Sequence, residues 1–293
     1  MRRASLLFLA LAAANLAATR PACAKGGVTP WKPAGISSPQ WESHPAFDPV
    51  NGDLYFVRSS PAFEGWHLLL SRCTATGWSN PEPPSFASDA IEADPWFTPD
   101  GATLYFISTR AFDGKKGKDL DIWRVDRKAD HSWGAPERLP EPVNSSETEW
   151  FPRLAPDGYL YFGSKRPGGL GGNDIWRARS DAAGHWSAEN LGPAINTQGD
   201  EYEPLPTADG KGLVVATADG FFSSRLTAKG WSARQKMSAD INANGTEIGP
   251  LFSPDGNSIL FSRDTKGPDS GEFFVWHGGG AQSWPPDCPT RAQ

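Results

Sequence analysis

Five glutamates occupy the same place in a repeated sequence pattern. Each stands three residues before a proline, and the five are Glu42, Glu92, Glu149, Glu201 and Glu247. If the copies fold alike around one axis, they set one carboxylate per copy at the rim of a central channel. A ring of like charge can hold a cation or a cationic ligand, so these glutamates are the candidate ligand-binding residues.

The alternative is a scaffold role for the same glutamates, in which each carboxylate bonds backbone amides or pairs with an arginine. Arginines stand at nearly equivalent points of four copies, and they are Arg58, Arg110, Arg166 and Arg263. Repetition in every copy favours a scaffold, because each unit of a repeat protein must hold its neighbours in the same way. Both roles remain open from the sequence.

Other residues that carry chemistry lack the spacing of a catalytic or metal site. The five histidines form no H-x-H or H-x-x-x-H pair, which argues against zinc. The glycine-rich segment 168–172, with Asp121 and Asp174 at equivalent points of two copies, is typical of turns between strands. No phosphate-loop, dinucleotide or G-x-S-x-G motif is present. We therefore predict no catalytic residue, no metal and no cofactor.

The elements that must position the glutamates are short strands. The anchor prolines are Pro45, Pro95, Pro152, Pro204 and Pro250, with repeats starting near residues 42, 92, 149, 201 and 247. A Pro-Asp-Gly type of turn follows most of them, then an aromatic or β-branched run such as Leu104 to Ile107. Two further strand-like segments complete each copy, and four strands per repeat is typical of a propeller blade.

The sequence therefore predicts an all-β fold, a propeller of five four-stranded blades over residues 25–293. The alternative of six blades would need about forty more residues. We expect the amino-terminal segment to join the last blade and close the ring, because that removes exposed sheet edges. Under this closure Cys73 and Cys288 come close together and are candidates for a disulfide.

The repeats resemble a known family. The pattern P-x-F-[ST]-P-D-G, then L-Y-F, then D-I-W, is similar to the TolB-like, WD40-like propeller repeat of bacterial envelope proteins, and the segment Gly168 to Trp176 is an especially close match. The resemblance covers roughly residues 42 to 285. It implies an exported propeller that mediates contacts with other proteins or with envelope polymers.

The first residues predict export. Arg2 and Arg3 precede an apolar stretch from Leu6 to Ala18, and an A-x-A site predicts cleavage of a signal peptide, residues 1–24, after Ala24. A lipoprotein acylated on Cys23 is the alternative, although an arginine and a proline come just before that cysteine. We expect a periplasmic or secreted protein.

Charge and hydropathy restrict the partners. Cleavage leaves 25 basic and 34 acidic side chains, a formal net charge of −9, which argues against nucleic acid and anionic membranes. No later stretch reaches the roughly 20 apolar residues of a membrane span. The sequence predicts a monomeric binding or scaffold protein without catalysis, whose partner is an envelope protein or glycan. The alternative is a propeller hydrolase acting on carbohydrate or lactone at the channel mouth.

Overall fold

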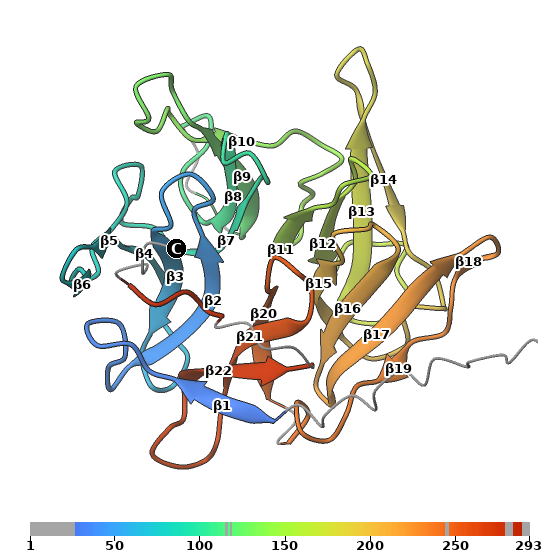
Figure 1. Ribbon diagram of the computed structural model, residues 1–293. Helices are drawn as coiled ribbons and strands as arrows, with labels where there is room; N and C mark the ends of the chain where they lie inside the picture. The colour runs from blue at the N-terminus through green and yellow to red at the C-terminus, as the bar shows by residue number, and fades with distance from the viewer. Residues whose placement is uncertain (1–26, 115–116, 118, 244–245, 279–283, 289–293) are drawn as a thin grey trace, which may run out of the picture.

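The computed structural model describes residues 27–114, 117, 119–243, 246–278 and 284–288. All regular structure within these residues is β, and the sheets are arranged radially as five blades around one axis (Figure 1). The predicted all-β propeller of five blades is therefore confirmed. The predicted signal peptide and Cys23 lie outside the described residues.

The strands follow the repeats of the sequence. The first blade consists of β2 (Trp41–Phe47), β3 (Leu54–Ser59) and β4 (His67–Ser71), with a hairpin of β5 (Cys73–Thr74) and β6 (Gly77–Trp78) beyond it. The second blade consists of β7 (Glu92–Phe97), β8 (Thr103–Ser108), β9 (Asp121–Asp126) and β10 (Glu137–Arg138). The third blade consists of β11 (Glu149–Leu154), β12 (Leu160–Ser164), β13 (Asp174–Ser180) and β14 (Trp186–Asn190).

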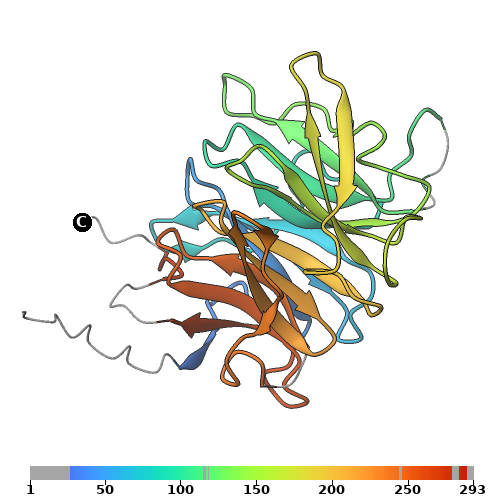
Figure 2. The ribbon, with the colours of Figure 1, turned by 90° about the vertical axis from the view of Figure 1, so that its right-hand side faces the viewer.

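The fourth and fifth blades repeat this order. The fourth contains β15 (Glu201–Pro206), β16 (Gly212–Thr217), β17 (Gly220–Thr227), β18 (Gly230–Trp231) and β19 (Gln235–Lys236). The fifth contains β20 (Glu247–Phe252), β21 (Ser258–Arg263), β22 (Glu272–His277) and β1 (Val28–Trp31). Strand β1 pairs antiparallel with β22, and the two lie side by side in the side view of Figure 2. Residues from both ends of the described chain thus share one blade.

The innermost strand of every blade carries the glutamate and proline of the repeat. These strands, β2, β7, β11, β15 and β20, contact one another in ring order, with β20 against β2. Each shows a register shift next to its anchor proline, because proline has no N–H to give to the neighbouring strand. At this shift the residue before the proline adopts a left-handed backbone conformation, which directs its side chain toward the axis.

Tight turns join the first two strands of each blade. In the third blade the Asp157 carboxylate accepts the amide N–H of Tyr159 at 3.0 Å, and Gly158 has a φ of 80°, which favours glycine. These turns form one face of the ring, which we call the turn face. The opposite face carries the first residues of the innermost strands, and we call it the strand-start face.

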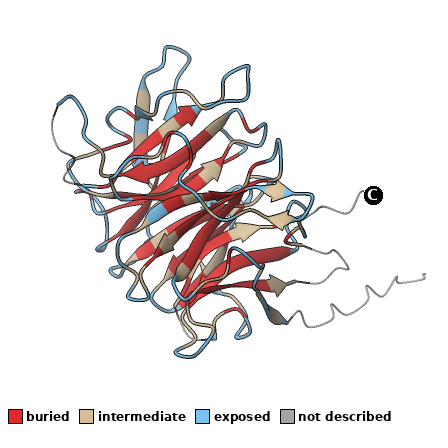
Figure 3. Ribbon diagram, turned by 90° about the vertical axis from the view of Figure 1, so that its left-hand side faces the viewer, coloured by how far each residue is buried: buried red, intermediate tan, exposed pale blue. Residues whose placement is uncertain are grey.

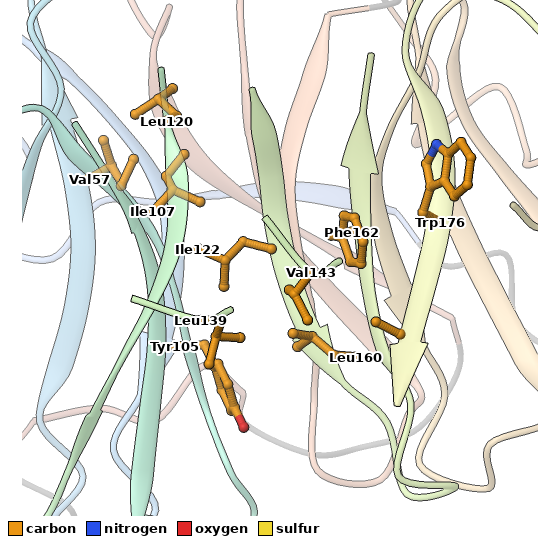
Figure 4. Packing of buried hydrophobic residues seen from close by; sticks show 12 residues of the cluster. Val57, Tyr105, Ile107, Leu120, Ile122, Leu139, Val143, Leu160, Phe162 and Trp176 are labelled. Carbon is orange, nitrogen blue, oxygen red and sulfur yellow. The ribbon is translucent and has the colours of Figure 1, made fainter. Parts of the chain in front are cut away.

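Apolar side chains fill the space between neighbouring blades. Figure 4 shows Ile107 and Ile122 of the second blade beside Leu160 and Phe162 of the third, all fully buried. Figure 3 shows the buried residues along the strands and the exposed ones in the connecting loops. Burial of these side chains stabilises each blade only against its neighbours, so the ring is the folding unit.

Cys73, at the start of β5, forms a disulfide with Cys288 across 215 residues of sequence, with the two Cα atoms 5.4 Å apart. The bond connects the edge of the first blade to the segment that follows the fifth.

In the described part of the chain, no helix has the length and apolar character needed to cross a membrane.

Candidate ligand-binding site at the axis

The five aligned glutamates lie at the start of the innermost strands, as the first residue in four of them and the second in β2, and are buried with at most 2% of each side chain exposed. Each carboxylate is paired with an arginine. The nitrogen to oxygen distances are 2.8 Å for Arg58 and Glu42, 2.8 Å for Arg166 and Glu149, 2.6 Å for Arg234 and Glu201, and 3.1 Å for Arg263 and Glu247, and Arg110 is bonded to Glu92. These contacts are those of the scaffold alternative.

A hydroxyl four residues before the glutamate completes the arrangement in four blades. The donors are Ser38, Ser88, Ser145 and Thr197, at 2.6 to 2.7 Å from the carboxylate. Burial raises the pKa of Glu42 and of Glu149, whereas the hydroxyl and the arginine act in the opposite direction. Each carboxylate thus fastens the loop from the preceding blade to the start of an innermost strand. The spacing S/T-x-x-x-E was the sequence signal for this role.

The glycine-rich loop is closed by its own carboxylate. The amides of Leu170 and Gly171 both donate to Asp174, and the amide of Asn173 donates to Asp200 at 2.7 Å. These N–H groups are therefore already bonded within the protein. The structural interpretation of this loop, a turn between strands, agrees with these contacts.

The residues before the anchor prolines converge on the axis. All five have a left-handed φ between 48° and 64°, and they are His44, Asp94, Phe151, Glu203 and Gly249. His44 contacts residues of the second, third and fourth blades, which is possible only at the centre of the ring. Its Nε2 lies 3.6 Å from Asp94 and 3.3 Å from Glu203, and its ring stacks on Phe151 at 5.1 Å.

A buried arginine and two backbone amides balance the charge of this axial cluster. The amide of Phe151 donates to Asp94 at 3.0 Å, and the amide of Gly249 donates to Glu203 at 2.5 Å. Arg153 is buried and interacts electrostatically with both carboxylates. Burial raises the pKa of Asp94 to about 6, even though His44 and Arg153 lower it. Asp94 therefore changes charge close to neutral pH.

A small cavity of about 30 Å³ lies beside this cluster, lined among others by His44, Asp94 and Phe151. That volume is enough for a water molecule or two. Among the described residues, no histidine, cysteine and carboxylate side chains are grouped in threes or more so as to hold a metal ion. The axis is filled at this level, and its polar groups bond mainly to one another.

A larger hollow of about 260 Å³ opens above the cluster, on the strand-start face. Its walls are formed by Trp41, Phe63, Tyr202 and Ile248, and Glu203 lies at its base. We call it the axial hollow. Phe63 lines both the axial hollow and the small cavity, so this ring separates them.

The aromatic rings between the hollow and the axis form a continuous series. Centroid distances are 5.0 Å from Trp41 to Phe63, 5.4 Å from Phe63 to Trp66, 5.7 Å from Trp66 to Trp150 and 6.0 Å from Trp150 to Phe151. The series starts in the first blade and ends in the third. Partly exposed aromatic surface on a rigid scaffold is a common feature of binding sites.

Sequence reasoning missed this site. The residue before each anchor proline was the signal, because its type differs in every copy while the glutamate and the proline stay the same. The reason it was overlooked is geometric. In a regular strand the side chain at this position would point to one side of its sheet, whereas the left-handed conformation at the bulge directs it to the axis.

The fold and the site define a β-propeller with a filled axis and an aromatic hollow at one mouth. No family model matches the chain. No curated protein matches its sequence.

Among solved structures, the chain is similar to a protein assigned to TolB from Agrobacterium tumefaciens, with 18% identity and a TM-score of 0.50 over 81% of this chain and 77% of that one. It is also similar to a gluconolactonase from Xanthomonas campestris, with 12% identity and a TM-score of 0.49 over 87% and 95% of the two chains. At these identities the likeness shows the fold alone. The resemblance to TolB-like propellers is confirmed at that level.

Proposed function

We propose that this protein is an exported, non-catalytic binding protein of the bacterial envelope, monomeric, which holds a protein or a glycan on its strand-start face. The observation that supports the proposal is the distribution of contacts on that face. The repeated carboxylates are used in buried ion pairs, whereas the aromatic side chains around the axial hollow are partly exposed. Exposed aromatic anchors commonly carry binding energy.

The strand-start face offers a second concave region beside the first. A groove of about 410 Å³ lies between the first and second blades, and Gln40, Arg58, Glu64 and His67 are among its lining residues. Its lining combines these polar and charged groups with apolar ones such as Leu69 and Pro83, while the axial hollow presents rings. An apolar anchor next to polar groups that fix orientation suits recognition of a protein or a glycan.

A propeller hydrolase is the second candidate, and the axial cluster is the reason to consider it. His44 between two carboxylates is a suitable set for acid–base chemistry. The cavity next to it holds about 30 Å³, far less than a sugar or lactone ring requires. His44 and Asp94 line only this small cavity, and Glu203 is the one group of the set that also lines the axial hollow. A substrate in the hollow would therefore meet one of the three groups, which favours binding over hydrolysis.

Binding is tested with the purified protein immobilised on a sensor surface. Soluble peptidoglycan fragments and a periplasmic protein extract are passed over it, over Tyr202→Ala, and over Tyr159→Ala. Tyr202 lines the axial hollow, whereas Tyr159 lies in a turn on the opposite face and serves as the matched control. We expect one fraction to bind, Tyr202→Ala to weaken binding, and Tyr159→Ala to leave it unchanged.

Three results would contradict the proposal. The first is equal loss of binding in both variants, and the second is no binding of either fraction. The third is turnover of chromogenic glycosides or of aldonolactones that disappears in Glu203→Gln, which would establish the hydrolase instead. Export is checked separately by sequencing the amino terminus of the mature protein, which we expect to begin at Lys25.

A further inference from the structure

We propose that the axial hollow binds an organic cation, an ammonium group that is presented by the ligand of the strand-start face. This inference rests on the proposed binding function and specifies the chemistry of its central contact. It follows from three features of the hollow, which are its rigid aromatic walls, the sign of the charges that line it, and the way its hydroxyl groups are used.

The aromatic walls are held in place before any ligand arrives. The indole N–H of Trp41 donates to Ser262 at 2.9 Å, and a Cβ at Gly271 would lie only 2.9 Å from the same indole. Phe63 has a left-handed φ of 60°, and the indole N–H of Trp66 donates to its carbonyl at 2.9 Å. Such a backbone conformation is strained for a bulky residue and is characteristic of ligand clamps.

The charges that line the hollow are acidic. Glu203 and Glu247 are among its lining residues, and no lysine or arginine is found there in the described part of the chain. Arg263, which pairs with Glu247, is buried and is not among the lining residues. The protein as a whole also has an excess of acidic side chains. Because Arg263 neutralises Glu247, the favourable potential for a cation at the mouth of the axis comes from Glu203 and from the acidic excess of the protein.

Aromatic faces with carboxylates nearby attract cations, because the ring quadrupole presents negative charge to the ligand. The axial hollow combines the rings of Trp41, Phe63 and Tyr202 with such carboxylates. Its volume of about 260 Å³ suits a single headgroup and not a polymer chain. The rest of the ligand would then extend over the strand-start face.

A stacked sugar is the alternative occupant, and the hydroxyls in the hollow argue against it. Thr217 donates to the carbonyl of Gly220 at 3.1 Å and accepts the amide of Asp219 at 3.0 Å. Thr246 donates to the carbonyl of Asp264 at 3.2 Å. These threonines are already bonded locally, whereas a sugar needs several protein groups that are available for its hydroxyls. A trimethylammonium group needs none.

The test compares two ligands of the same shape. The purified protein is titrated with choline and with 3,3-dimethylbutan-1-ol, in which carbon replaces the nitrogen, and binding is followed by calorimetry at low ionic strength. We expect choline to bind about tenfold more tightly. Equal affinity for the two compounds, or no binding of choline, would overturn the inference.

Variants at the rim and in the wall of the axial hollow provide the second readout. Ala218 lies at the rim of the hollow and its side chain is exposed, so the fold tolerates a change there. We expect Ala218→Glu to strengthen choline binding several-fold and Ala218→Arg to weaken it by a similar factor. Tyr202→Phe keeps the ring and should keep the affinity, whereas Tyr202→Ala should lose it. An equal change of choline affinity in Ala218→Glu and in Ala218→Arg would also overturn the inference.

The outcomes separate this inference from the proposed function. If N-acetylglucosamine binds in a Tyr202-dependent way while choline does not, the cation site is wrong and the binding protein stands. If neither peptidoglycan fragments nor periplasmic proteins bind to the unmodified protein, the proposed function fails, whatever choline does.

Discussion

Arg234 lies 2.6 Å from Glu201, although it comes from a different part of its repeat than the arginines of the other four ion pairs. In the other blades the arginine lies at the end of the second strand or just after it, 16 to 18 residues after the glutamate, where the fourth blade has Thr217, Ala218 and Asp219. Arg234 instead stands between β18 and β19. The fold therefore requires a cation at this point, and a different residue supplies it.

Replacing Arg234 with alanine should destabilise the propeller by about 3 kcal/mol, because it leaves the buried Glu201 carboxylate without its charged partner. The measurement is urea unfolding followed by tryptophan fluorescence. Arg225→Ala is the control, since Arg225 pairs with Asp209 on the exposed surface, and its loss should cost less than about 0.5 kcal/mol. Equal destabilisation by the two changes would show that the buried pair has no special role.

The Asp94 carboxyl should make the stability depend on pH. Its pKa is about 6 in the fold and 3.8 in the unfolded chain, with burial as the main cause. Between these values the folded protein binds a proton that the unfolded chain does not. The free energy of unfolding should therefore fall, by about 3 kcal/mol, as the pH rises from about 4 to above 6.

The check is Asp94→Asn, which removes the titrating group and keeps its shape. The groups that face Asp94 are His44, Glu203, Arg153 and the Phe151 amide, and they remain in both proteins. Between pH 4 and pH 7 the free energy of unfolding should fall by about 3 kcal/mol more in the parent than in Asp94→Asn. The same pH dependence in both proteins would refute the prediction.

The disulfide should stabilise the ring. A cross-link between Cys73 and Cys288 closes a loop of 215 residues, for which the chain-entropy account gives about 5 kcal/mol at most. Cys73→Ser combined with Cys288→Ser should therefore lower the urea midpoint without changing the far-ultraviolet spectrum. Titration of the denatured, unreduced mature protein with a thiol reagent should detect no free thiol, and two reactive thiols per chain would contradict the bond.

Phe63 should protect the axial cluster from solvent. Its ring separates the axial hollow from the cavity beside His44, so Phe63→Ala should join the two spaces. We expect modification of His44 by diethyl pyrocarbonate, followed by peptide mass spectrometry, to become much faster. Phe112→Ala, a change at an exposed ring elsewhere, should leave the rate unchanged. A slow His44 reaction in both variants would place the barrier elsewhere.

The architecture could be predicted from the sequence because its signals repeat. The turn at Asp157 and Gly158 uses a side chain and a backbone preference that are local properties. Four of the arginine partners were also visible, since residues such as Arg58 and Arg166 stand at nearly equal distances in sequence from their glutamates. The sequence left two roles open for the five glutamates, a ligand-binding ring and a scaffold, and their buried ion pairs are the contacts expected of the scaffold.

The axial hollow could not be predicted, because no local property indicates it. His44 and Glu203 are 159 residues apart and meet only when the ring is complete. Arg234 was missed for a related reason, since it pairs with Glu201 from 33 positions further along the chain, outside the spacing of the other pairs. Contacts between blades that form only when the ring closes cannot be predicted from the spacing of residues within one repeat.

The frame of the ring and the contents of its centre depend on different residues. Hairpins, ion pairs and interblade packing hold the frame, and these residues project into its centre. Substitutions at His44, Asp94, Phe151 or Glu203 can therefore alter what the core of the ring is made of while the frame persists. Gly249 is the exception, because a Cβ there would lie 2.5 Å from the backbone nitrogen of His44. Related chains could thus diversify their interior at four points, with the fifth fixed by lack of space.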